Sequence, residues 1–238
     1  MPVADAAAAD AADGDAMPLI DILAPLCAYL LGSISFAWIV ARLHGVDLRQ
    51  HGSGNLGATN VGRVLGGPWF VVVFLADIAK GLLPVLTVLH IVPLAQLTLA
   101  PALLGVATGL GAVLGHVFPC YHGFRGGKAV ATSLGVCVGL APLVAAVTFG
   151  VWSLVYGIGV ALKQGRSGAV GPASILAAPV APIAQILIAV EPWGRELPIT
   201  CLLLLLAVLI LIRHRRNIAA LLRHGRDDIG PEARDVKG

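Results

Sequence analysis

The chain has 238 residues, of which 58% are hydrophobic and only 12% are Asp, Glu, Lys or Arg. A soluble globular chain has about 45–50% apolar and roughly a quarter charged residues, so this composition, with a mean hydropathy of +0.89, indicates a polytopic integral membrane protein. It excludes a cytosolic enzyme, a coiled coil and a nucleic-acid module, and the net charge of +3 is too small to indicate a nucleic-acid partner. Four widely spaced cysteines indicate neither a disulfide framework nor a zinc site.

The N-terminal segment is rich in Ala and Asp and has no Lys or Arg before the first apolar run. A secretory signal would need a basic start, so we predict a disordered acidic leader over residues 1–17. A single membrane domain is expected over residues 18–225. A polar cytoplasmic tail is expected over residues 226–238.

The apolar segments predict an all-α fold with about seven transmembrane helices, several of them short. They cover residues 18–43, 69–92, 97–115, 129–162, 173–190 and 198–212. The fourth segment has 34 residues, which is too long for one crossing of about 20 residues. We therefore expect Ala141-Pro142 to divide it into two short helices.

Lys and Arg gather in the loops that seven spans would place on one face. These cations are Arg42, Arg49, Arg63, Arg125, Lys128, Lys163 and Arg166, together with those of the C-terminal tail. The positive-inside rule places this face in the cytoplasm. The N-terminus is then outside and the C-terminus cytoplasmic, and five spans would give the same ends.

The first polar motif is GSGNLGATNVGR, at residues 52–63. Its glycines let the backbone approach a ligand, and successive N–H groups can form a nest for an anion. Ser53, Asn55 and Thr59 add hydroxyl and amide groups, and Arg63 adds a planar fork suited to phosphate. The alternative is a flexible loop between helices, but such a loop needs no set of polar donors.

The second motif is GHVFPCYHGFRGGKAVAT, at residues 115–132. Gly126, Gly127 and Lys128 open the next apolar helix, and a helix N-terminus beside a lysine can bind phosphate. The spacing differs from a Walker A loop. The alternative is a loop whose cations only set the membrane orientation.

The third motif, RHRRNI at residues 213–218, follows the last apolar run. His214 and Asn217 are three residues apart and would share a face of a continuing helix. A stop-transfer cluster explains the arginines but not this pair. Within the second span, Asp77 and Lys80 can form an ion pair, either structural or in support of a site.

The motifs together hold cations and amides but no carboxylate pair and no nucleophile beside a base, and metal-dependent transfer would need acidic ligands. This inventory favours direct displacement between two bound phosphorylated substrates. A transporter of an organic phosphate is the alternative from another class. No histidine has an aspartate five positions later, so the sequence lacks the H-x-x-x-x-D motif of another type of acyltransferase.

The three motifs, with LGSISFA (31–37) and ADIAKGLLPV (76–85), resemble those of the bacterial acyl-phosphate:glycerol-3-phosphate acyltransferase (PlsY) family. The resemblance covers residues 20–225. It implies a seven-helix enzyme of the bacterial inner membrane with its active site on the cytoplasmic face. The implied reaction moves a fatty acyl group from acyl phosphate to the sn-1 hydroxyl of glycerol 3-phosphate, in phospholipid biosynthesis. The implied products are lysophosphatidic acid and phosphate, and no metal, cofactor or acyl-enzyme is implied.

The resemblance also implies roles for individual residues. Its catalytic residues would be Ser53, Asn55, Thr59 and Lys128, and its substrate-binding residues would be Gly54, Gly57, Ala58, Arg63, Gly126, Gly127, Ser174, His214 and Asn217. The first motif and Lys128 would hold the acyl-phosphate head, and Arg63 would hold glycerol 3-phosphate with His214 and Asn217. A family serine aligns with either Gly171 or Ser174. His214 as a general base is the alternative to proton transfer to the substrate phosphate. Membrane lipids are the other expected partners, and the sequence leaves the oligomeric state open, a monomer being one option.

Overall fold

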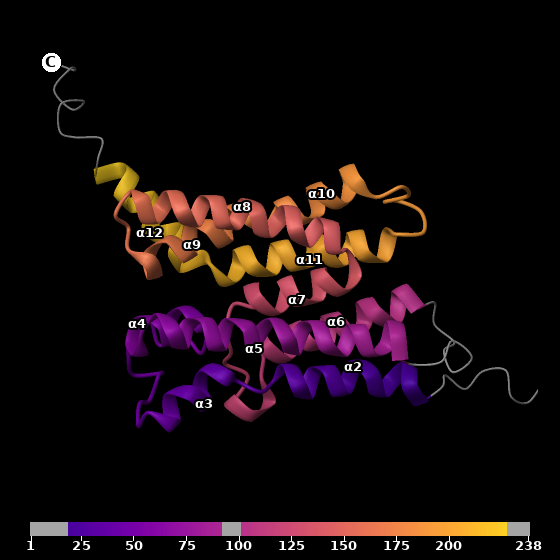
Figure 1. Cartoon of the computed structure of the whole chain (residues 1–238), viewed down its shortest axis with the longest axis horizontal. Coiled ribbons are helices and arrows are strands. Elements are labelled where there is room, and N and C mark those ends of the chain that lie inside the picture. Colours follow the sequence, from indigo (N-terminus) through magenta and orange to yellow (C-terminus); the bar gives the residue numbers. More distant parts are fainter. Residues whose placement is uncertain (1–18, 92–100, 228–238) are drawn as a thin grey trace, which may run out of the picture.

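The structure is a computed structural model that describes residues 19–91 and 101–227. The described residues form helices and no strand, so the all-α prediction is confirmed (Figure 1). The predicted leader, residues 92–100 and the tail from residue 228 lie outside the described residues. The helices are α2 (Leu19–Gly32), α3 (Phe36–Leu43), α4 (Ala58–Leu65), α5 (Gly67–Leu86) with a π-helical turn (Thr87–Ile91), α6 (Pro101–Val117) with a 3-10 turn (Cys120–His122), α7 (Val130–Leu140), α8 (Pro142–Ala161), α9 (Arg166–Ala177), α10 (Val180–Ile188), α11 (Leu197–Arg213) and α12 (Arg215–Asp227).

Five helical segments of the described chain are long and apolar enough to cross a membrane. A sixth results if α11 and α12 form one span with a bend of 58°. Helix α7, with 11 residues, is a shorter apolar helix. These helices fit the expected polytopic architecture, and the count of seven stays a prediction. The five segments cover Leu19–Leu43, Gly67–His90, Pro101–His122, Pro142–Ala161 and Arg166–Ile188.

The long apolar run at residues 129–162 is divided where the sequence predicts. Helix α7 ends at Leu140 and α8 begins at Pro142. Proline suits the first turn of a helix because its missing N–H would have no partner there. The predicted division at Ala141-Pro142 is confirmed.

The first apolar segment is interrupted near its middle. Helix α2 ends at Gly32, and α3 begins at Phe36 with Ser35 as its N-cap. The carbonyl of Ile34, within this break, accepts a hydrogen bond of 2.9 Å from Lys80 Nζ on α5. The break therefore supplies a polar backbone group to a buried lysine.

Helix α7 packs directly against α5. A Cβ at Gly135 would strike the backbone of Ile78, so only glycine allows the two helices this approach. The N-terminal end of α7 thereby lies beside the turn of α5 that carries Asp77 and Lys80. This packing joins the second motif to the ion pair of the second span.

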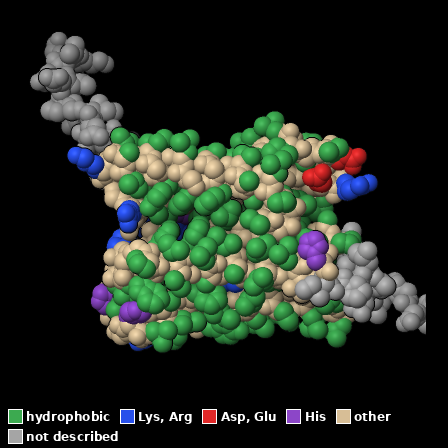
Figure 2. Space-filling view, in the orientation of Figure 1, with side chains coloured by type: hydrophobic (Ala, Val, Ile, Leu, Met, Phe, Trp, Pro, Cys, Tyr) green, Lys and Arg blue, Asp and Glu red, His purple; other side chains and the backbone are tan. Residues whose placement is uncertain are grey.

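Charged side chains gather at the two ends of the bundle, and hydrophobic side chains cover its middle (Figure 2). Lys, Arg and His side chains lie at the end formed by α3, α4 and α12. Helix α2 begins at the opposite end, and α12 lies at the basic end (Figure 1). The described parts of the chain thus begin and end on opposite sides, as an odd number of spans requires.

Candidate active site

The glycine-rich motif at residues 52–63 is a loop followed by a helix, which differs from the loop expected from the sequence. Helix α4 begins at Ala58, directly after Gly57. Thr59 and Arg63 are therefore four residues apart on one helical face. Ser53 and Asn55 lie on the preceding loop. A short helix thus orients part of the donor set that the sequence indicated.

Asn60 holds the loop against α4. Its side chain is 1% exposed. Its Oδ1 accepts a hydrogen bond from the backbone N–H of Ser53 at 2.8 Å, and its Nδ2 donates to the carbonyls of Leu48 (3.2 Å) and His51 (3.0 Å). These bonds satisfy a buried amide, so the loop has a fixed shape before any ligand binds.

Gly126 and Gly127 fix the position of the backbone that leads to Lys128. Arg213 donates hydrogen bonds to the carbonyls of Gly126 (2.9 Å) and Gly127 (3.2 Å). The backbone N–H of Gly127 donates to the carbonyl of His116 at 3.1 Å. The His116 ring occupies the place of a Cβ at residue 127. Glycine is needed here for packing, whereas the sequence indicated direct substrate contact.

Lys128 connects the second motif with the third. Its Nζ donates a hydrogen bond of 2.5 Å to Asn217 Oδ1. Lys128 precedes α7, and Asn217 lies in the first turn of α12. The contact places an ammonium group where segments 89 residues apart in sequence meet.

His214 lies between two helices, which differs from the continuing helix expected for residues 213–218. Helices α11 and α12 meet at an angle of 58° beside it. The His214 side chain is 2% exposed, and its Nδ1 lies 2.8 Å from the carbonyl of Ile210. A carbonyl can only accept, so Nδ1 carries a proton. The neutral ring then presents Nε2 as an acceptor.

One cavity of about 140 Å³ joins the three motifs. Three of the expected residues, Gly54, Gly126 and Gly127, do not line it. Gly126 and Gly127 line a smaller cavity beside His116. The expected residues that do line it are Ser53, Asn55, Gly57, Ala58, Thr59, Arg63, Lys128, Ser174, His214 and Asn217.

The cavity has an excess of positive charge. Burial, together with the positive charges of Arg213 and Arg63, lowers the pKa of Lys128 to about 8. The ammonium group is still protonated at neutral pH. The carboxylate that lines the cavity, Asp77, is paired with Lys80. The described residues contain no cluster of three His, Cys, Asp or Glu side chains able to hold a metal ion. The arrangement suits anionic phosphate groups.

Activity is expected to fall as the pH rises through the pKa of Lys128, about 8. Below that value the ammonium attracts a substrate phosphate, and above it the neutral amine does not. The profile of kcat/KM reports groups of the free enzyme and should fall about tenfold per pH unit on this limb. Initial rates corrected for spontaneous acyl-phosphate hydrolysis measure it. Lys128→Arg keeps its charge and should lack the limb; an unchanged limb in that variant would assign it to another group.

A buried ion pair supports the floor of the cavity. Lys80 Nζ lies 2.9 Å from Asp77 Oδ1, and both side chains are almost fully buried. His116 Nδ1 lies 3.7 Å from the same carboxylate and 3.2 Å from Thr132 Oγ1. The network therefore connects α5, α6 and α7, and Asp77 and His116 line the same cavity as Lys128.

Lys80→Met is expected to destabilise the protein by about 3–5 kcal/mol, because it leaves the buried Asp77 carboxylate unpaired. Thermal unfolding in detergent micelles measures the change. The double variant Asp77→Asn/Lys80→Met removes both charges and should recover most of the lost stability. Full activity in the folded double variant would make the pair structural only, and equal instability in both variants would contradict the ion-pair argument.

The two alternatives for the family serine both lie on α9. Ser174 Oγ donates to the carbonyl of Val170 at 2.8 Å and accepts from Trp152 Nε1 at 3.2 Å. Gly171 lies against the third motif, since a Cβ there would be 2.6 Å from Asn217 Nδ2. Ser174 thus fastens α8 to α9, and Gly171 leaves room for the amide that binds Lys128.

Phe74, Trp152 and Ser167 also line the cavity, although the sequence motifs did not predict them. Phe74 and Trp152 lie within apolar spans, where the pattern does not distinguish a cavity wall from a buried packing residue. Ser167 is half-buried near the start of α9. A serine directly after Arg166, at the start of a span on the basic face, is the signal that could have found it.

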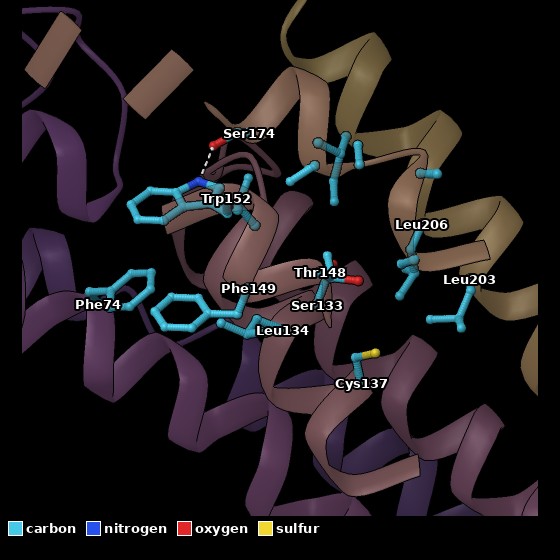
Figure 3. A pocket seen from close by; sticks show the side chains of 16 residues that line it. Phe74, Ser133, Leu134, Cys137, Thr148, Phe149, Trp152, Ser174, Leu203 and Leu206 are labelled. Carbon is cyan, nitrogen blue, oxygen red and sulfur yellow. Dashed lines mark hydrogen bonds between the residues drawn. The ribbon is translucent and has the colours of Figure 1, made fainter. Parts of the chain in front are cut away.

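An apolar pocket adjoins the polar cavity (Figure 3). The two share Phe74, Val130, Trp152 and Ser174 as lining residues. The Trp152–Ser174 hydrogen bond lies at the boundary between them. From there the pocket continues along α7, α8 and α11, toward Cys137 and Leu203. The site as a whole therefore has a charged part and an apolar part.

The chain matches the family model described as glycerol-3-phosphate acyltransferase over residues 22–224. A glycerol-3-phosphate acyltransferase of Aquifex aeolicus (strain VF5) is 40% identical over 195 residues, 82% of this chain and 92% of the relative. The corresponding protein of Thioalkalivibrio sulfidiphilus (strain HL-EbGR7) is 41% identical over 211 residues, 88% of this chain and 94% of the relative.

Two crystal structures of PlsY (YgiH), an integral membrane glycerol 3-phosphate acyltransferase, share this fold. The glycerol 3-phosphate form has a TM-score of 0.73 and 38% identity, and the lysophosphatidic acid form has 0.71 and 37%. Each comparison covers 86% of this chain and 92% of the other. Together with the polar cavity and its apolar extension, these matches show that the chain belongs to the glycerol-3-phosphate acyltransferase (PlsY) family of integral membrane proteins.

Proposed function

We propose that this protein transfers a fatty acyl group from acyl phosphate to the sn-1 hydroxyl of glycerol 3-phosphate. The products are 1-acylglycerol 3-phosphate and inorganic phosphate. The observation that carries the proposal is the junction of a cation-rich cavity with an apolar pocket. One end suits phosphate groups and the other suits a fatty chain.

The polar cavity has room for phosphate beside two different kinds of cation. Lys128 is a compact ammonium group that hydrogen-bonds Asn217, and we assign it to the acyl-phosphate head. Arg63 extends from α4 with a planar fork that matches phosphate oxygens, and we assign it to glycerol 3-phosphate. His214 and Asn217 complete that second subsite. This division keeps the two phosphates on separate cations.

The apolar pocket would hold the first part of the acyl chain. Phe74, Phe149 and Trp152 give it aromatic walls on α5 and α8 (Figure 3). Burying each methylene group contributes about 0.8 kcal/mol, so a fatty chain gains more from this pocket than a short one. The acyl carbonyl would then lie near the boundary, beside the loop that carries Ser53 and Asn55.

The transfer needs no covalent intermediate on the enzyme. The hydroxyl oxygen of glycerol 3-phosphate forms a bond to the acyl carbonyl carbon, and the carbon–oxygen bond to phosphate breaks. The departing phosphate takes up the hydroxyl proton, so atoms and charge balance. Holding both substrates in place supplies up to about 7–11 kcal/mol of the barrier in favourable cases. The donors Ser53, Asn55 and Thr59 would stabilise the developing oxyanion.

His214 as the proton acceptor is the competing mechanism, because its Nδ1 proton is committed to the carbonyl of Ile210, which leaves Nε2 as the acceptor of the ring. A His214→Ala enzyme separates the two. Loss of affinity for glycerol 3-phosphate with most of kcat retained supports a binding role. Loss of kcat with little change in KM supports the base, and an acyl-enzyme trapped by mass spectrometry would overturn direct transfer.

The active site is proposed to face the cytoplasm from the bacterial inner membrane. The cavity lies at the end of the bundle that carries most of the Lys and Arg side chains (Figure 2). The positive-inside rule assigns such an end to the cytoplasm. The domain would then comprise residues 18–225, with the leader outside and the tail in the cytoplasm. Cysteine labelling from each side of sealed vesicles tests this orientation.

In the decisive assay, the purified protein is incubated with glycerol 3-phosphate and one of three acyl donors. The donors are palmitoyl phosphate, palmitoyl-CoA and palmitoyl-acyl carrier protein. We expect phosphate release and lysophosphatidic acid formation with palmitoyl phosphate alone. Equal rates with the thioesters would contradict the proposed donor. Uptake of glycerol 3-phosphate into proteoliposomes without acyl transfer would instead identify a transporter.

A further inference from the structure

A second basic cavity lies on the same end of the molecule as the candidate active site. It has a volume of about 450 Å³ and is open to the surface. It is formed by the α2–α3 break, by α3 with the loop that follows it, and by the 3-10 turn after α6. It shares no lining residue with the active-site cavity. We refer to it as the α3 groove; its lining residues are Ile34, Ser35, Trp38, Ile39, Arg42, Arg49, Tyr121 and His122.

Two guanidinium groups of the α3 groove have no acidic partner. In the described part of the chain, the ion pairs join Asp77 only to Lys80 and His116. The Arg42 guanidinium lies 5.5 Å from the centre of the Trp38 ring. Arg49 Nη2 donates to the backbone carbonyl of His122 at 3.5 Å. Both cations are held near the groove, yet their charge is not compensated there.

Asp47 is the carboxylate nearest in sequence to these arginines, and its oxygens are already used. One oxygen accepts from the backbone N–H of Arg49 at 3.1 Å, and the other accepts from Gln50 Nε2 at 3.1 Å. It caps its own turn and leaves the Arg49 side chain available. The groove therefore keeps a surplus of two positive charges, and Tyr121 also lines it.

The α3 groove lies where the membrane surface is expected. The first candidate span ends at Leu43, and the third ends at His122. Leu43, Phe118 and Phe124, each within three residues of a lining residue in sequence, are exposed apolar side chains. Tryptophan and tyrosine are typical of the boundary between acyl chains and headgroups. A ligand here would meet cations on one side and apolar side chains on the other.

We infer that the α3 groove binds the phosphate headgroup of an anionic membrane phospholipid. The two arginine forks match phosphate oxygens, and the surrounding apolar side chains match the start of the acyl chains. Basic pockets between transmembrane helices on the cytoplasmic side recognise headgroups in this way. The site is independent of acyl transfer, since no residue of the active-site cavity takes part.

The test measures binding of dioctanoyl phosphatidylglycerol to the full-length protein in a neutral detergent by native mass spectrometry. We expect saturable binding that Arg42→Gln/Arg49→Gln weakens by about tenfold or more. Lys163→Gln/Arg166→Gln is the matched control, because it also removes two exposed cations at the basic end. Equal loss of binding in both double variants would mean that the lipid responds to the net charge of the basic end, and it would contradict a specific site in the α3 groove.

A second arm identifies the source of the phosphate. Dioctanoyl phosphatidylcholine and inorganic phosphate are each added as competitors of phosphatidylglycerol. Weak competition by both supports an anionic lipid site, and displacement by inorganic phosphate at equal concentration overturns it. Arg42→Lys/Arg49→Lys keeps the charge and should retain part of the affinity. Acyltransferase activity in every variant verifies the fold, and unchanged lipid binding by folded Arg42→Gln/Arg49→Gln would refute the inference.

Discussion

Replacement of Lys128 by methionine is expected to reduce kcat/KM by about 10³-fold. Methionine keeps most of the length of the side chain but removes the ammonium that donates to Asn217 at 2.5 Å. Among the residues that the structure describes, Lys128 is the one lysine that lines the cavity. In the proposed reaction the phosphate gains charge as it leaves, so the cation stabilises the transition state more than the bound substrate. Steady-state phosphate release at varied palmitoyl phosphate measures the loss.

Arg215→Gln is the matched control for this experiment. Arg215 is exposed, and it does not line the cavity, although it is only two residues from Asn217. Its activity should stay close to that of the unaltered protein. If Arg215→Gln were as inactive as Lys128→Met, the phosphate would have to bind outside the present cavity, and the site would need to be moved toward α12.

The sequence predicts the membrane architecture well because its signal is the length of apolar runs. A run of 34 residues cannot be one ordinary span, and Pro142, which has no N–H to donate, marks the start of the second helix. The same reasoning misses the break at Ile34. Apolar residues surround that break, and its use is to give Lys80 an acceptor, the carbonyl of Ile34, through a contact between segments distant in sequence.

The polar motifs point to the cavity but not to the way each residue contributes. Gly126 and Gly127 have the composition of a phosphate loop, yet the first hydrogen-bonds Arg213 and the second packs on His116. Asn60 lies in the same motif as Thr59, but its amide is consumed by the loop. Composition gives the same signal for a residue that binds a ligand and for one that shapes the backbone around it.

The apolar half of the site is the part that the sequence hides most completely. Trp152 lies in a span whose side chains are mostly exposed to the membrane region, and nothing in its pattern separates it from its neighbours. Its indole N–H bonds Ser174, and this contact needs α8 and α9 to be packed. In a membrane protein the wall of an acyl pocket and a lipid-facing surface use the same residues, so only the packing distinguishes them.

Arg63→Met is expected to raise the KM for glycerol 3-phosphate by roughly 10- to 100-fold. Hydrogen bonds to a charged group contribute about 1.5–3 kcal/mol, and the variant loses them. KM for palmitoyl phosphate should change much less. Arg63 extends from α4, whereas Lys128 precedes α7, so the two cations can serve different substrates. Initial rates with each substrate varied in turn measure the two constants.

Arg63→Lys tests whether the planar fork matters as well as the charge. A lysine keeps the charge but cannot bind two phosphate oxygens side by side, so its KM for glycerol 3-phosphate should lie between those of Arg63→Met and the unaltered protein. Arg223→Met removes an exposed arginine of α12 whose Nε donates to the carbonyl of Ala219 on the same helix, and it should leave both constants unchanged. If Arg63→Met raised only the KM for palmitoyl phosphate, the two assignments would have to be reversed. Arg63 would then bind the acyl phosphate, and Lys128 would bind glycerol 3-phosphate.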